Sequence, residues 1–84
     1  MIHELELVVL NRDLQDHGLL CGDVGTVVHS YANGSAFEVE FVNAEGNTIA
    51  VLTLTAEDVR KMQGDEILHV RERVATWSCP KKTR

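Results

Sequence analysis

Residues 36–42 (AFEVEFV) alternate between apolar and acidic side chains over most of their length. In an extended chain Phe37, Val39 and Phe41 share one face, and Glu38 and Glu40 share the other. This period of two predicts a β-strand with one buried face and one face in water, as in antiparallel sheets. An antiparallel sheet is therefore the main constraint on what this chain can fold into.

Turn-forming residues separate this strand from other strand-like segments. Asn33-Gly34 predicts a tight hairpin turn before it, because both residues tolerate positive φ. Thr55 and Asp58 predict one short helical turn, with Thr55 as its cap. The other segments that we expect to form strands are rich in leucine and β-branched residues: 5–11, 24–31, 48–54 and 66–71.

Length and composition limit how these strands assemble. A chain of 84 residues forms one domain, and with 5% aromatic residues its small core must be mainly aliphatic. The pattern predicts an all-β fold, a small five-stranded antiparallel SH3-like barrel with the helical turn before its last strand. We assign residues 1–71 to the barrel and residues 72–84 to a basic C-terminal tail. In the loop 12–23, Leu14, Leu19 and Leu20 are expected to cover one end of the core.

Membrane and secreted classes do not fit the sequence. No stretch approaches the roughly 18 apolar residues of a membrane span. Glu4 and Glu6 interrupt the apolar run at the N-terminus, which has no basic lead and so does not match a secretory signal. We therefore expect a cytoplasmic protein that does not associate with membranes.

The residues that could carry chemistry form no recognisable catalytic pattern. The four histidines lack the clustered spacing of a metal site. Cys21, partly buried, and Cys79 are expected as reduced thiols; a bridge between them would need the tail to fold back. Gly22, Asp23 and Gly25 lack the following helix and the lysine of a phosphate loop, and so predict a turn that starts the strand 24–31. In this turn Gly25 is expected to let another strand approach closely. We expect no enzyme, no metal and no cofactor.

Charge divides the chain into two parts. Residues 1–70 carry twelve acidic and three basic residues, a net charge of −9, whereas residues 71–84 carry five basic residues and one acidic residue, a net charge of +4. An acidic body repels nucleic acid and attracts basic proteins. We therefore predict a protein partner, with nucleic acid disfavoured.

The partner-binding candidates fall into two groups. Glu38, Glu40 and Glu45 form an acidic landing surface on and beside the strand 36–42, with Tyr31 next to it. The second group is Arg71, Arg73 and Trp77, which belong to the basic residues 71–84. Trp77 can either anchor a partner or pack back on the barrel, and the tail could exchange between copies in a homodimer.

A set of mostly glycine, acidic and apolar residues carries a specific resemblance to a known family. The positions are Asp13, Leu14, Gly18, Leu19, Gly22, Asp23, Gly25, Thr26, Val27, Val28, Phe37, Glu38, Val39, Glu40 and Phe41. Through them the stretch 17–54 resembles a small bacterial family of uncharacterised proteins known as domain of unknown function 4926, and the resemblance covers about the first 60 residues. It implies an SH3-like barrel and, because some members are encoded beside toxin-like genes, an antitoxin or immunity role.

A second, shorter resemblance gives the alternative function. The stretch around Gly22–Val28 is similar to the KOW-type element of ribosomal and transcription-factor barrels. It implies a nucleic-acid module, which would have to use the basic residues near the C-terminus. These are Arg71, Arg73, Lys81, Lys82 and Arg84.

Overall fold

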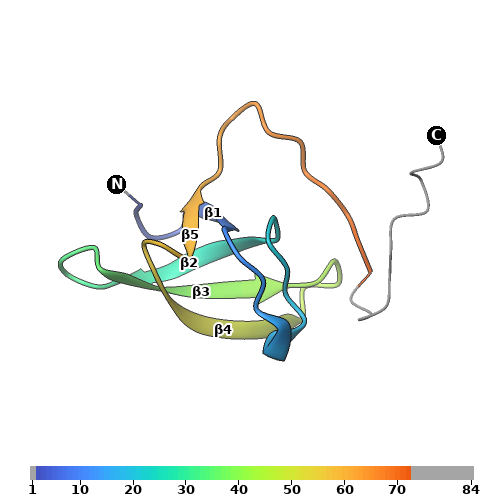
Figure 1. Cartoon of the computed structure of the whole chain (residues 1–84), viewed down its shortest axis with the longest axis horizontal. Helices are drawn as coiled ribbons and strands as arrows, with labels where there is room; N and C mark the ends of the chain where they lie inside the picture. The colour runs from blue at the N-terminus through green and yellow to red at the C-terminus, as the bar shows by residue number, and fades with distance from the viewer. Residues whose placement is uncertain (1, 73–84) are drawn as a thin grey trace.

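The computed structural model describes residues 2–72, whose strands form one antiparallel sheet (Figure 1). The strands are β1 (Leu7–Leu10), β2 (Val24–Ser30), β3 (Ala36–Val42), β4 (Thr48–Thr55) and β5 (Val59–Lys61), and a three-residue 3-10 helix, η1 (Gln15–His17), lies between β1 and β2. The all-β class and the five antiparallel strands are as predicted.

The strand order requires the sheet to curl. It runs β4-β3-β2-β1-β5, so that β4 and β5, which are consecutive in the chain, lie at opposite ends of the order. The link of residues 56–58 can span only about 14 Å. The edge strands of a flat five-stranded sheet would lie about 19 Å apart. The sheet therefore bends until β4 and β5 approach each other, which is consistent with the small barrel that the sequence predicts.

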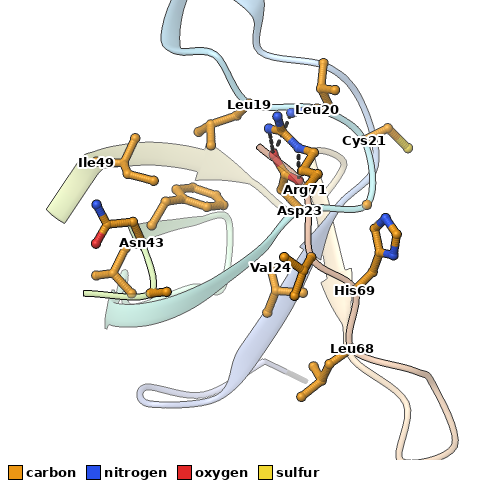
Figure 2. Close-up of a pocket in the computed structure, with 15 residues that line it drawn as sticks. Leu19, Leu20, Cys21, Asp23, Val24, Asn43, Ile49, Leu68, His69 and Arg71 are labelled. Carbon is orange, nitrogen blue, oxygen red and sulfur yellow. Dashed lines mark hydrogen bonds and ion pairs between the residues drawn. The ribbon is translucent and has the colours of Figure 1, made fainter. Parts of the chain in front are cut away.

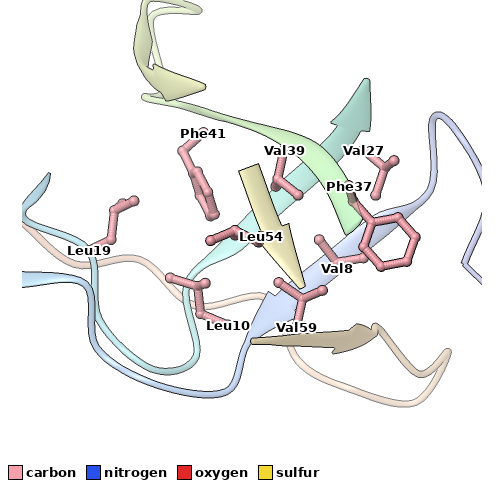
Figure 3. Packing of buried hydrophobic residues seen from close by; sticks show 9 residues of the cluster. All are labelled: Val8, Leu10, Leu19, Val27, Phe37, Val39, Phe41, Leu54 and Val59. Atoms are coloured by element: carbon pink, nitrogen blue, oxygen red, sulfur yellow. The ribbon is translucent and has the colours of Figure 1, made fainter. Parts of the chain in front are cut away.

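The curled sheet encloses an aliphatic core with two phenylalanines (Figure 3). Phe37, Val39 and Phe41 are buried as their alternation predicts. Leu19 closes one end of the core, whereas Leu20 is 39% exposed. The complete cluster is Val8, Leu10, Leu19, Val27, Phe37, Val39, Phe41, Leu54 and Val59.

The last strand was predicted in the wrong place. It is β5, residues 59–61, and not the segment 66–71. Val59 is buried in the core and pairs with Leu10 of β1, so β5 completes the barrel immediately after the link from β4. Residues 66–71 pair with no strand of the sheet and form no strand in the described chain.

The turns also differ from their predicted geometry. Residues 55–58 form a turn and not a helix. The hydrogen bonds of a helix cap are nevertheless present: the Asp58 carboxylate accepts the Thr55 N–H (2.9 Å), and the Thr55 hydroxyl accepts the Glu57 N–H (3.3 Å). Among residues 2–72 the 3-10 helix η1 lies instead in the loop before β2. In the β2–β3 hairpin only Gly34 has positive φ (71°), because Tyr31 pairs with Ala36 across a four-residue loop.

Candidate protein-binding face

The outer face of β3 presents the two predicted carboxylates. Because Phe37, Val39 and Phe41 point into the core, Glu38 and Glu40 point away from it, between β2 and β4. In the strand register Glu38 lies between His29 and Thr53. Glu40 lies between Thr26 and Val51. The sheet therefore sets each carboxylate in a row of side chains from three strands.

Glu38 is held by two hydroxyl groups. The hydroxyls of Tyr31 and Thr53 donate to the same oxygen, Oε2, at 2.7 and 2.6 Å. Thr53 and then Tyr31 lower the pKa of the Glu38 carboxyl, and the same carboxylate raises the pKa of Tyr31. Glu38 is therefore an oriented anion at neutral pH and not a freely rotating surface group.

Glu40 is held in a similar way, nearer the β3–β4 turn. The hydroxyl of Thr48 donates to its Oε2 at 2.6 Å. Val51, which pairs with Glu40 across the sheet, leaves 51% of its surface exposed. The face thus places an accessible apolar side chain beside oriented carboxylates, an arrangement that resembles the apolar centre and polar rim of a protein interface.

Glu4 extends this face and was not among the predicted site residues. Its Oε2 lies 3.4 Å from Nδ1 of His29 and accepts the Ser30 N–H at 3.4 Å. The His29 ring in turn meets Tyr31 edge-on, with ring centroids 4.7 Å apart. Sequence reasoning missed Glu4 because only the fold brings the N-terminal segment to the end of β2. We call Glu4, Tyr31, Glu38, Glu40 and Val51 the acidic face.

The remaining predicted residues lie elsewhere. Glu45 is exposed in the β3–β4 turn, where its carboxylate accepts from the Asn47 side chain at 3.4 Å. Arg71 is bound within the chain: its Nε donates to Oδ1 of Asp23 at 2.9 Å, and its Nη2 donates to Oδ2 of Asp23 and, at 2.9 Å, to the Gly18 carbonyl (Figure 2). Arg73 and Trp77 lie outside the described residues.

The acidic face belongs to a strongly acidic part of the chain. Residues 2–72 contain thirteen acidic and four basic residues. Each of the four basic side chains is already in an ion pair within this part of the chain, and none of the four pairs uses a carboxylate of the acidic face. The pairs are Arg12–Asp58, Arg60–Glu66, Lys61–Glu6 and Arg71–Asp23.

A hollow beside the Arg71–Asp23 pair is the other candidate site. It measures about 620 Å³ and lies between the loop 19–24, the β3–β4 turn and residues 68–71 (Figure 2). Its walls include Leu20, Val24 and Ile49, with Cys21 at the rim; Cys21 is exposed and not partly buried as expected. Among residues 2–72 no cluster of three or more histidine, cysteine or acidic side chains is placed to hold a metal ion.

Fold and surface together define a small all-β domain with an acidic, partly apolar outer face. Residues 4–61 match the family described as "Domain of unknown function (DUF4926)", which is more than half of the chain, so the protein belongs to this family. No curated protein and no solved structure matches the chain. In the described residues no helix is long and apolar enough to cross a membrane.

Proposed function

We propose that this protein is a cytoplasmic, non-enzymatic module that binds a basic protein through the acidic face. The observation that supports it most directly is the charge imbalance: the Arg and Lys side chains of residues 2–72 are all paired, while Glu38 and Glu40 point outward, held by hydroxyl groups. Such a field accelerates association with a positively charged protein and selects against acidic competitors. Hydroxyl-held carboxylates also lose less side-chain entropy on binding than mobile ones.

Within this class an antitoxin or immunity role is the specific proposal. Two points support it. Some members of the family that the chain resembles are encoded beside toxin-like genes, and the acidic face would complement a basic toxin. The alternative, a KOW-like nucleic-acid module, has less support, because Arg71 is engaged by Asp23 and the body around it is acidic.

Co-expression with the protein encoded by the adjacent gene tests this function. We expect stoichiometric co-purification and relief of a growth defect caused by that protein alone. The double variant Glu38→Lys/Glu40→Lys should abolish both. The matched control Asp16→Lys/Glu57→Lys makes the same change in net charge at exposed loop positions and should keep both.

Two results would count against the proposal. Equal co-purification of both double variants would remove the acidic face as the contact. The absence of any complex, together with RNA binding that weakens with salt and disappears on deletion of residues 72–84, would favour the nucleic-acid alternative.

A further inference from the structure

The segment 66–71 (EILHVR) has the sequence of a strand but no strand to pair with. Ile67, Leu68 and Val70 are 89%, 70% and 88% exposed. The backbone N–H and C=O groups from Ile67 to Val70 form no hydrogen bond with residues 2–72. A strand-like segment with exposed apolar side chains and unpaired backbone is a template for pairing with another chain.

The segment is nevertheless held in place at both ends. At one end Nη1 and Nη2 of Arg60 donate to Oε1 and Oε2 of Glu66 at 3.0 and 2.6 Å, and the Gln63 N–H donates to the same carboxylate at 2.6 Å. At the other end Arg71 is bound to Asp23. After β5 the chain follows a wide arc, drawn in orange (Figure 1). Part of the entropy of ordering the segment is therefore already lost before any partner binds.

We propose that two copies of this chain pair antiparallel through residues 65–71 and form a two-fold symmetric dimer. In such a dimer the two-fold axis is perpendicular to the paired strands and lies midway between them. Each side chain then stays on the same face of the pair as its copy, so one residue of the segment must lie opposite its own copy. The two central choices are Leu68 and His69.

Charge selects between these two registers. With His69 on the axis, Glu66 lies opposite Glu72 of the other copy, and like charges directly opposite destabilise a strand pair. With Leu68 on the axis, no like charges lie opposite each other, and Asp65 lies opposite Arg71 of the other copy, whose guanidinium stays bound to its own Asp23. The Leu68 register is therefore the self-complementary one.

The hydrogen bonds fit the same register. The Glu66 N–H already donates to the Gln63 carbonyl at 3.1 Å, so it is not available to a partner strand. In an antiparallel pair alternate residues bond across the pair, and here these can be Ile67 and His69. Leu68 then forms a non-hydrogen-bonded pair with its own counterpart, the closer of the two pair types, with Val70 on the same face.

Sedimentation velocity of the full chain over a concentration series tests the dimer. We expect a monomer–dimer shift that Leu68→Lys abolishes. Val28→Lys is the matched control, since Val28 is an exposed apolar residue of β2 outside the acidic face, and it should keep the shift. A chain that remains monomeric at every concentration, including one in which residues 73–84 cover the segment instead, would overturn the proposal.

Cysteine cross-linking then tests the register. In a Cys21→Ser/Cys79→Ser background, Leu68→Cys, Ile67→Cys and Val70→Cys are oxidised with diamide. Only position 68 lies opposite itself, so its covalent dimer should form on the order of tenfold faster than at 67 or 70. Equal rates at the three positions would overturn the register. The proposal does not rest on the acidic face, so failure of one leaves the other standing.

Discussion

At the scale of single residues, Gly25 shows how closely this small core is packed. It lies buried in β2, and a Cβ atom built there would come within 2.6 Å of Cγ1 of Val39 and 2.8 Å of Cε2 of Phe41. The sequence suggested that another strand approaches Gly25; in the structure the close neighbours are two side chains of β3. The glycine is therefore required by packing and not by its backbone conformation.

Gly25→Ala should lower the free energy of unfolding by about 1–3 kcal/mol, because the added methyl group must displace Val39 and Phe41. Urea denaturation of the variant measures the effect. Gly64→Ala is the control: its added methyl group would meet nothing within 4 Å, so the variant should be neutral or slightly stabilised. Equal stability of Gly25→Ala and the wild type would contradict this account of the core.

At the scale of elements, the chain after β5 is positioned by side chains and not by a strand ladder. Arg60 of β5 and the Gln63 N–H both bond the Glu66 carboxylate. The Arg60 hydrogen bonds are the main cause that lowers the pKa of Glu66 from 4.5 to about 2, and the Gln63 N–H is the second. The position of the start of the segment 66–71 therefore depends on the negative charge of the Glu66 carboxylate.

The contact of Glu66 with Arg60 and Gln63 should weaken as the pH falls. A pKa that is lower in the folded chain stabilises the contact above about pH 4.5, and the stabilisation is lost as the pH falls toward 2. A carbon-13 NMR titration of the Glu66 carboxyl should give a midpoint near 2, and Arg60→Gln should raise that midpoint toward 4.5. An unchanged midpoint in Arg60→Gln would show that the ion pair is not the cause.

At the scale of the whole molecule, the buried core and the family match end almost together. The buried cluster extends from Val8 to Val59, and the match ends at residue 61. The described residues after that point contribute no member of the cluster, and Arg71 joins them to the barrel through Asp23. Residues 65–71 are thus an addition to a core that is complete without them.

A chain that ends after Gly64 should therefore fold cooperatively with the far-UV circular dichroism of a β protein. We expect its free energy of unfolding to fall by about 1–3 kcal/mol, because Asp23 loses its charged hydrogen-bond partner. Arg71→Gln in the full chain should reproduce most of this loss. A shortened chain without a cooperative transition would show that residues 65–84 are part of the folding unit.

The sequence by itself determined the fold class, the β-strand at residues 36–42 with its buried and outward faces, and the acidic body, because side-chain alternation and charge are local properties. Only the tertiary structure decided which segment completes the sheet. Both residues 66–71 and residues 59–61 have strand-like sequences. The three-residue link after β4 decides between them, because it brings Val59 to the free edge of β1 and into the core. The tertiary structure also brought Glu4 beside His29 and Arg71 beside Asp23. These partners are separated by 25 and by 48 positions in the sequence, so their contacts depend on how the sheet curls and cannot be found from a local sequence pattern.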